Sequence, residues 1–192
     1  MGLSGLVVLP LRGLGRILRG ERAGLDQIGS ASRVGWILSF LVPAFLVAPA
    51  YAWLTLQRFA ELEYAPESFG DVAVEVLGYI VGLTAFANVA HILCARLGRQ
   101  AAWYDYVAAY NWATVPQIAL YLPVALIGAS DAVPGSIAFA FGVGAVAAAI
   151  AIHFRVARVV LQVTQVQALL LVVVDLAVGQ LVARIVDRMH GL

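Results

Sequence analysis

Residues 136–186 read SIAFAFGVGAVAAAIAIHFRVARVVLQVTQVQALLLVVVDLAVGQLVARIV, and this stretch decides the fold. It consists of two long apolar runs separated by a short, more polar stretch near residues 161–164. The hydrocarbon core of a bilayer is about 30 Å thick, so a helix that crosses it needs about 20 mostly apolar residues. Each run has that length, which predicts two membrane-spanning helices joined by a tight turn.

A capping box places this turn. Neither Gly nor Pro occurs between Ala145 and Val178, so the break between the two helices must come from another signal. Thr164 is followed three residues later by Gln167, a pattern in which the hydroxyl and the amide cap each other's backbone N–H groups at a helix start. We therefore expect the first of the two helices to end near Leu161 and the second to begin just after Thr164.

The same length criterion finds three more apolar segments. The expected fold is therefore an all-α, polytopic transmembrane bundle of five spans, at residues 34–56, 72–94, 106–128, 136–160 and 166–186. Of the 192 residues, 62% are hydrophobic and only 12% are charged, and the mean hydropathy is +0.92. Soluble domains have roughly 45–50% apolar and about 25% charged residues, so a bilayer is the expected solvent.

Arginine is unevenly distributed between the two ends of this predicted bundle, and short loops rich in positive residues stay in the cytoplasm. One end carries Arg12, Arg16, Arg19, Arg22, Arg33, Arg96, Arg99, Arg155 and Arg158, whereas the other carries Arg58, Arg184 and Arg188 with the acidic Glu61, Glu63, Glu67 and Asp71. We expect a cytoplasmic N-terminus and a C-terminus outside. The absence of Lys is typical of a GC-rich bacterial genome, so the expected location is a bacterial inner (plasma) membrane.

Residues 1–33 form a basic N-terminal segment for which two interpretations stay open. Leucines and arginines fall on different helical sides, as in a helix that lies in the membrane interface; they are Leu11, Leu14 and Leu18, and Arg12, Arg16 and Arg19. Gly13, Gly15 and Gly20 would each weaken such a helix by about 1 kcal/mol relative to Ala. The alternative is a disordered tail whose arginines only fix the topology.

Polar residues inside the predicted spans recur at helical spacing, which places them on common faces. The third span carries Tyr106, Tyr110, Thr114, Gln117 and Tyr121, the second carries Thr84, Asn88 and His91, and the fifth carries Asp175 near mid-depth. These faces predict a polar seam inside the bundle. Its candidate binding or proton site comprises Asp175, Gln117, Asn88, His91, Asn111 and Tyr110.

The seam has a functional and a structural interpretation. It can be a proton or small-solute path in which Asp175 titrates, or it can hold the helices together through hydrogen bonds. The structural interpretation is favoured because the sequence indicates no second charge at mid-depth. His153 is expected with Arg155 at the cytoplasmic end of the fourth span, where long side chains reach the headgroups, and His190 shows no partner pattern.

Close helix packing is predicted by two sets of small residues, Gly78 with Gly82, and Ala140 with Gly144 and Ala148. Such spacing lets helix backbones approach each other within a bundle or between two copies.

No catalytic motif is present in the sequence. It contains no Gly-rich phosphate loop, no Gly-x-Ser-x-Gly elbow and no paired metal-binding histidines, and Cys94 is its one cysteine. The net charge of +1 argues against nucleic acid as a partner. We expect no enzyme activity, no cofactor and no metal.

The expected role is an interaction with membrane lipids, a partner protein or a second copy. The alternative is a small transporter or proton-linked permease centred on Asp175.

Residues 97–121 resemble part of a known family. A basic, Gly-containing loop (Leu97-Gly98-Arg99-Gln100) precedes a Tyr-rich helix start at residues 104–110, and Pro116 then leads into an apolar run. This order resembles the third-span region of the Yip family of five-span membrane proteins, and residues 163–168 are similar to the turn before that family's last span. The resemblance implies the five-span fold and a non-enzymatic role. The acidic-aromatic motif and long cytoplasmic N-terminus of the eukaryotic members are missing, so GTPase binding is not implied.

Overall fold

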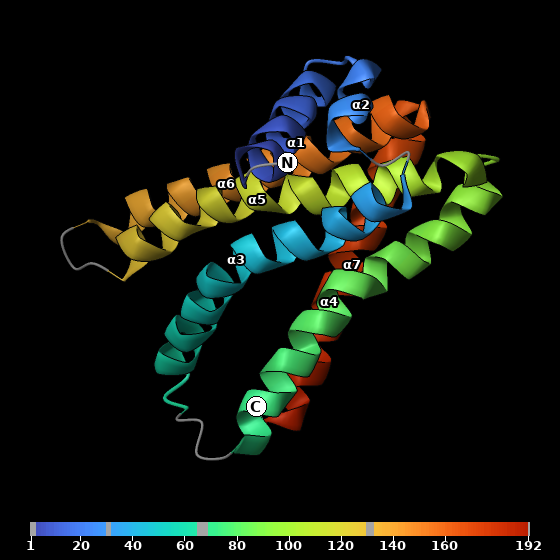
Figure 1. The fold of residues 1–192 in the computed structure, drawn as a ribbon. Coiled ribbons are helices and arrows are strands. Elements are labelled where there is room, and N and C mark those ends of the chain that lie inside the picture. Colours follow the sequence, from blue (N-terminus) through green and yellow to red (C-terminus); the bar gives the residue numbers. More distant parts are fainter. Residues whose placement is uncertain (1–2, 30–31, 65–68, 130–132, 192) are drawn as a thin grey trace.

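The computed structural model describes residues 3–29, 32–64, 69–129 and 133–191, and all regular structure in these ranges is helical (Figure 1). The elements are α1 (Leu3–Leu18), η1 (Arg22–Gly24), α2 (Leu25–Ile28), α3 (Arg33–Glu61), α4 (Phe69–Arg96), η2 (Gln100–Ala102), α5 (Trp103–Gly128), α6 (Gly135–Leu161) and α7 (Gln165–Met189). Each predicted span lies within one of the helices α3 to α7. The largest difference is in α3, which continues to Glu61 rather than ending at Leu56.

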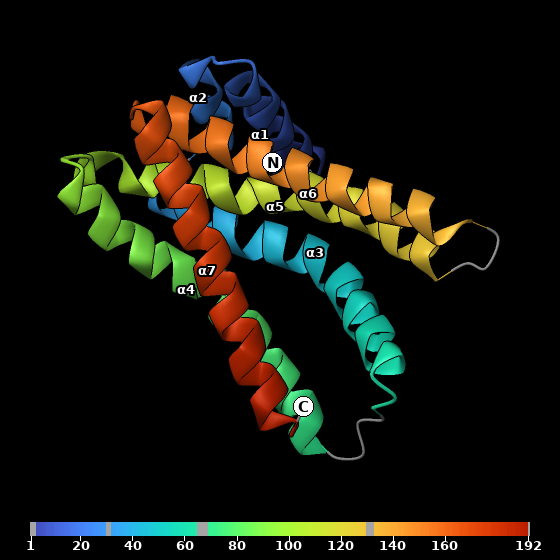
Figure 2. The same cartoon turned by 180° about the vertical axis from the view of Figure 1, so that it is seen from behind.

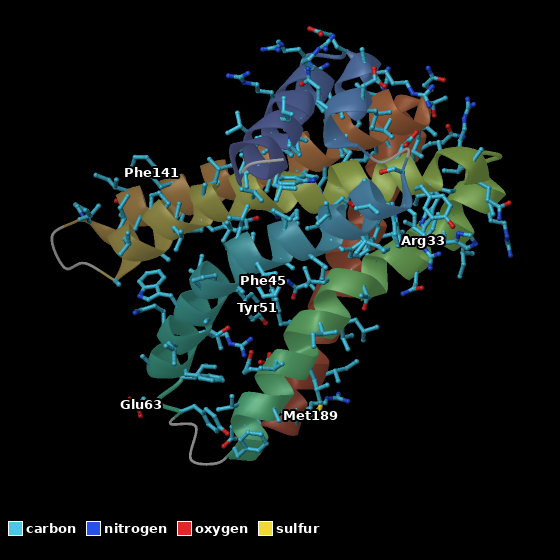
Figure 3. All side chains as sticks on the ribbon, in the orientation of Figure 1. Arg33, Phe45, Tyr51, Glu63, Phe141 and Met189 are labelled. Atoms are coloured by element: carbon cyan, nitrogen blue, oxygen red, sulfur yellow. The ribbon has the colours of Figure 1, made fainter. Side chains whose placement is uncertain are left out.

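Four of these helices, α3, α4, α6 and α7, are long and apolar enough to cross a membrane. Large apolar side chains such as Phe45 on α3 and Phe141 on α6 are exposed on them (Figure 3). Helix α5 is as long as they are but is not among them, because its first half carries Asp105, several tyrosines and Asn111. That half is enclosed by protein: Tyr106, Val107 and Trp112 are 1–2% exposed. A helix face that meets other helices instead of acyl chains tolerates polar groups, which explains the lower hydropathy.

The long helices form two pairs that cross near one end of the molecule and separate toward the other. Figures 1 and 2 show α5 beside α6 and α4 beside α7, with α3 running along α5 before it bends toward the free ends of α4 and α7. Pro43 and Pro49 lie inside α3. Each removes a backbone donor and crowds the preceding turn, which accounts for the bend. The bend brings the end of α3 close to α4 and α7.

The turn between α6 and α7 has the predicted form. Helix α6 ends at Leu161, and Gln162 adopts a left-handed conformation with φ of 52°. The Thr164 hydroxyl accepts from the Gln167 backbone N–H at 3.3 Å, and the Gln167 side chain accepts from the Thr164 N–H at 2.9 Å. The capping box is therefore confirmed, and it fixes where α7 begins.

The N-terminal segment folds back onto the bundle, where α1 packs against α5 and α6 (Figure 2). Leu14 and Ile17 are 2% and 0% exposed, so part of the apolar face of α1 meets protein. A Cβ atom at Gly13 would overlap the carbonyl oxygen of Gly24, and one at Gly24 would overlap that of Gly13. Gly13, which weakens the helix in isolation, is thus required for its packing. Gly20, with φ of 98°, ends α1.

The small residues predicted to pack have different outcomes. A Cβ atom at Gly78 would lie 2.5 Å from Cγ2 of Val186, so Gly78 lets α4 approach α7 closely. A Cβ atom at Gly82, in contrast, would have no atom of another helix within 4 Å. Packing of the predicted set within the bundle is not observed for α6, because Ala140 and Gly144 are exposed and the buried small residues are Ala145 and Ala149. The side of α6 that faces the bundle therefore carries Ala145 and Ala149. A contact of the predicted set with a second copy stays a prediction.

Candidate functional site

A chain of polar side chains connects α5, α6 and α7 inside the bundle. Tyr110 donates to Asp175 Oδ1 at 2.7 Å, and Asp175 Oδ2 lies 3.0 Å from His153 Nδ1. The other ring nitrogen, Nε2, lies 3.1 Å from Gln117 Oε1, and the Gln117 amide donates to the Tyr121 hydroxyl at 3.4 Å. We call these five residues the seam. They connect three helices through hydrogen bonds at each end and, in the middle, through the close approach of His153 Nδ1 to Asp175, which does not have the geometry of a hydrogen bond.

The seam is nearly closed to its surroundings. The side chains of His153 and Asp175 are 5% and 16% exposed. The Tyr110 ring packs on Phe86 and against the His153 ring, with centroid separations of 4.7 Å for both. A carboxylate and an imidazole in such a place interact strongly because little water screens them. Either side chain alone would be a buried polar group without its partner, so the two depend on each other.

The structure unites three of the six residues of the predicted site and leaves two of them outside. Asp175, Tyr110 and Gln117 belong to the seam. Asn88 is instead exposed and donates to the Thr84 carbonyl of its own helix. His91 is also exposed and packs edge-on against Trp103, at 4.9 Å between centroids. The polar face of α4 was therefore placed wrongly, because that side of α4 is turned away from α7.

Asn111 is the sixth residue of the predicted site. It follows Tyr110 in the sequence and is buried, but it is not part of the seam. Its side chain is 4% exposed, and its amide nitrogen has no hydrogen-bond acceptor among the described residues. Its backbone carbonyl accepts a hydrogen bond from Thr114 at 2.7 Å. It contributes to the polar interior of α5 without extending the seam.

The structure places His153 inside the bundle, whereas the sequence analysis placed it among the headgroups. It lies two turns before the end of α6 and faces α5 and α7, so it cannot reach the interface as an arginine can. A signal for this was present: Ala145, Ala149, His153, Val156 and Val160 recur at helical spacing and are all buried. His153 is also the second ionisable group within the bundle that the sequence analysis found lacking.

A second polar cluster ties together the ends of α3, α4 and α7. We call it the end cluster; its members are Arg58, Tyr64, Asp71, Glu75, Asp187 and His190. Arg58 contacts Glu75 at 3.1 Å and Asp187 at 3.2 Å. His190 lies 3.4 Å from Asp71 and 3.1 Å from Glu75, and Tyr64 donates to Asp71 at 2.8 Å.

The end cluster gives His190 partners that no pattern in the sequence indicates. Its side chain is 0% exposed, and Phe59 and Tyr64 pack edge-on against its ring. Its partners Asp71 and Glu75 precede it by more than 100 residues, so no local pattern in the sequence reveals them.

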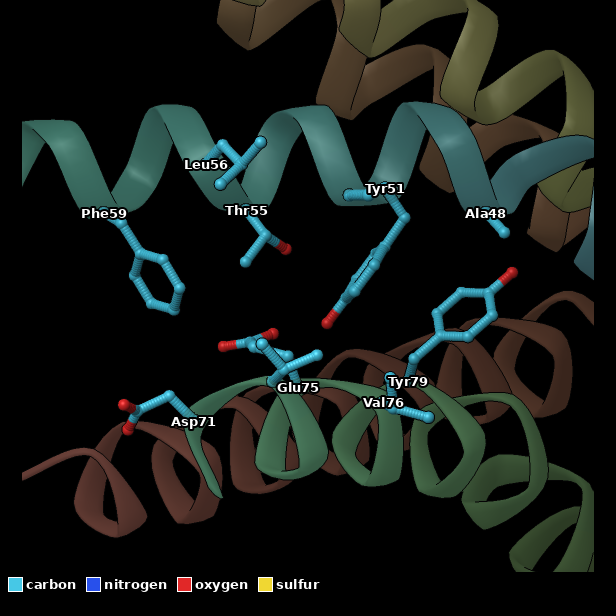
Figure 4. Close-up of a pocket in the computed structure, with 11 residues that line it drawn as sticks. Ala48, Tyr51, Thr55, Leu56, Phe59, Asp71, Glu75, Val76 and Tyr79 are labelled. Atoms are coloured by element: carbon cyan, nitrogen blue, oxygen red, sulfur yellow. The ribbon is translucent and has the colours of Figure 1, made fainter. Parts of the chain in front are cut away.

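A cavity of about 340 Å³ lies between α3 and α4 beside the end cluster (Figure 4). Its walls are mainly aliphatic and aromatic, and Tyr51 and Glu75 project into it from opposite sides. Leu56, Val72 and Val76 at its edge are 58%, 54% and 53% exposed, so the cavity opens on the apolar outer surface of the bundle. Tyr79 bridges its inner end by donating to the Ala44 carbonyl at 2.6 Å.

Within the described part of the chain, no group of three or more His, Cys, Asp or Glu side chains is arranged to hold a metal ion. The chain matches no protein-family model, no curated protein and no solved structure. The seam and the cavity are therefore interpreted from their own geometry.

Proposed function

We propose that this chain is a five-span protein of a bacterial plasma membrane, with a cytoplasmic N-terminus and an external C-terminus. The four apolar helices support this, and the 26 residues of α5 reach about 39 Å at about 1.5 Å per residue, enough to cross a bilayer. The α4–α5 connection, which contains Arg99, and the last turns of α6, which contain Arg155 and Arg158, lie at the same end as α1 and α2 (Figure 1), and this supports the orientation. The Yip-like features at residues 97–121 support the same arrangement.

The topology is tested with a reporter that fluoresces only in the cytoplasm. Fused after Leu192, the reporter is expected to stay dark, because five spans place that end outside. The control fusion, after Arg99, follows two spans and is expected to be bright. A bright signal from the Leu192 fusion would contradict an odd number of spans.

We further propose that the protein acts without catalysis, by binding a membrane lipid between α3 and α4. The cavity there carries this proposal, because it combines apolar walls with an opening on the surface that acyl chains cover. Sites for apolar ligands are concave and mainly apolar, with a few polar groups that fix the orientation. Tyr51, Thr55 and Glu75 supply these polar groups at one end (Figure 4).

Ala52→Phe is expected to block this site. Ala52 lines the cavity and is exposed, so a phenyl ring there fills the space without disturbing buried contacts. The measurement is photocrosslinking in vesicles with a lipid that carries a diazirine on its acyl chain, followed by mass spectrometry of α3 and α4. We expect labelling of the cavity walls to fall to the level of an open helix face such as that of α6.

The matched control is Ala151→Phe, the same substitution at an exposed position of α6 that lines none of the cavities described above. It should leave labelling between α3 and α4 unchanged. Equal labelling of wild type and Ala52→Phe would contradict the lipid site, and crosslinks from the cavity to a protein helix instead would identify a partner as its occupant.

A proton-linked transport role is a second candidate, which the His153–Asp175 pair favours. Two ionisable groups connected to Tyr110 and Gln117 give a proton a path within the bundle. Proteoliposomes containing a pH-sensitive dye test this under a potassium diffusion potential. A dye response with wild type that is lost in Asp175→Asn, at equal amounts of folded protein, would support proton movement. No response with wild type would retire the candidate.

A further inference from the structure

Three polar side chains of α4 are turned away from the protein's own bundle. Thr84, Asn88 and His91 recur at helical spacing, so they share one face of the helix, and all three are exposed. We call these residues the α4 stripe. Helix α4 lies at the margin of the bundle, in front of α7 in Figure 1 and behind it in Figure 2. The α4 stripe therefore meets whatever surrounds the protein.

The α4 stripe lies at the depth of the hydrocarbon in the orientation proposed above. Arg96 ends α4, and an arginine at the end of a span reaches the headgroups. At a rise of about 1.5 Å per residue, Asn88 lies about 12 Å and Thr84 about 18 Å from Arg96 along the helix axis. An amide exposed to acyl chains is unfavourable unless another group bonds to it. The position of Asn88 thus calls for a partner from outside the bundle.

Part of the hydrogen-bonding capacity of the α4 stripe is unused. The Thr84 hydroxyl donates to the Ile80 carbonyl at 3.0 Å, and the Asn88 amide donates to the Thr84 carbonyl at 2.8 Å. The Asn88 side-chain oxygen accepts no hydrogen bond from the described residues, and neither ring nitrogen of His91 is bonded to one of them. An amide with a free oxygen and a second N–H is both a donor and an acceptor, and so is a neutral imidazole.

A second copy of this chain matches these groups. Two copies inserted in the same orientation are related by a two-fold axis along the membrane normal, so each residue at the axis meets its equivalent at the same depth. Asn88 would then face Asn88. Two amides bond to each other reciprocally, whereas two carboxylates or two guanidinium groups would repel each other. The residues of the α4 stripe carry no fixed charge, so the face is complementary to itself.

Apolar side chains around Asn88 complete this face. Val81 and Ala95 lie seven residues before and after Asn88 on the same side of α4, and both are exposed. Ile80 and Ile92 flank them and are 51% and 58% exposed. In lipid, helices associate through close packing and through hydrogen bonds between polar side chains. The face offers both, with the amide at its centre.

We propose that two copies of the protein associate through their α4 stripes, with the Asn88 amides bonded to each other across the interface. The inference rests on α4 crossing the membrane and is independent of the lipid site. The cavity between α3 and α4 is lined by residues 71–79 of α4, which precede the α4 stripe and face α3. Association through the α4 stripes therefore leaves the cavity open.

The first test is disulfide formation in vesicles that contain the full-length protein at low density. The native Cys94, which is buried, is replaced by alanine in all samples. Ala95→Cys then places one cysteine on the face of the α4 stripe, and oxidation is expected to yield a covalent dimer. Ala151→Cys is the matched control, the same substitution at an exposed position of α6, and is expected to stay monomeric.

The second test removes the central amide. Energy transfer between labelled copies in vesicles gives the Kd of the dimer, and Asn88→Leu is expected to raise this Kd about tenfold, the factor for about 1.4 kcal/mol and thus for one hydrogen bond between membrane helices. Asn88 is exposed, so the leucine leaves the packing of each copy unchanged. Gln180→Leu is the control: it removes an exposed amide from α7 and should keep the wild-type Kd.

The outcomes separate this inference from the lipid site. A wild-type protein that stays monomeric in vesicles would overturn it. A dimer whose Kd is the same in Asn88→Leu, or one that is crosslinked through Ala151→Cys and not through Ala95→Cys, would place the contact on another surface and also overturn it. Photolabelling of the cavity between α3 and α4 should be equal in wild type and Asn88→Leu, so the loss of the dimer leaves the lipid site intact.

Discussion

Asp175→Leu is expected to lower the free energy of unfolding by about 1–3 kcal/mol, because it leaves two buried polar side chains without the carboxylate that they contact. His153, 5% exposed, loses the carboxylate 3.0 Å from its Nδ1. Tyr110 at the same time loses the acceptor of its 2.7 Å hydrogen bond. The measurement is the loss of monodisperse protein on heating in mild detergent, followed by size-exclusion chromatography.

The double variant Asp175→Leu with His153→Leu tests the reason for this loss. Removing both partners leaves no imidazole or carboxylate without its counterpart, so part of the lost stability should return, although Tyr110 and Gln117 still lack their contacts. Leu176→Ala serves as a control on the same helix, because Leu176 is 47% exposed and its truncation should have little effect. If Asp175→Leu proves as stable as this control, the pair is not coupled as described.

Gly78→Leu should separate α4 from α7 and lower stability by about 1–3 kcal/mol, the usual effect of overpacking. Even a single Cβ atom at Gly78 would lie 2.5 Å from Val186. The displacement would extend to the end cluster, since Asp187 and His190 follow Val186 on α7 and contact Arg58 and Glu75. The same heating assay measures the effect.

Gly82→Leu is the matched control, because it changes the same residue type one turn further along α4. No heavy atom lies within 4 Å of a Cβ built there, so the leucine would extend into open space. Its melting behaviour should match wild type. Equal losses of stability from the two substitutions would mean that the contact of Gly78 with α7 does not determine the outcome.

The helices follow from the sequence because their signals are local. Span lengths come from runs of apolar residues, and the break before α7 comes from Thr164 and Gln167, which are only three residues apart. Helix α5 departs from this rule. Its burial by other helices permits Tyr106 and Asn111, and its mean hydropathy is accordingly lower than that of the four apolar helices.

The polar contacts were predicted only in part, because spacing gives the face of a helix but not its rotation against neighbours. Asp175, Tyr110 and Gln117 do meet, whereas Asn88 and His91 lie on a side of α4 that faces away. The end cluster depends on residues separated by 115 and 119 positions. Such contacts arise only once the bend in α3 and the crossing of α4 and α7 are known.

The burial of α5 has a consequence for biogenesis. A helix with Asp105 and Asn111 in its first half partitions poorly from the translocon into lipid when it emerges alone, because each polar side chain would face hydrocarbon. Helix α6, its most extensive neighbour, is synthesised directly after it. As the fifth span proposed above, α5 is therefore expected to integrate stably only together with α6, so that the two helices enter the bilayer as a hairpin.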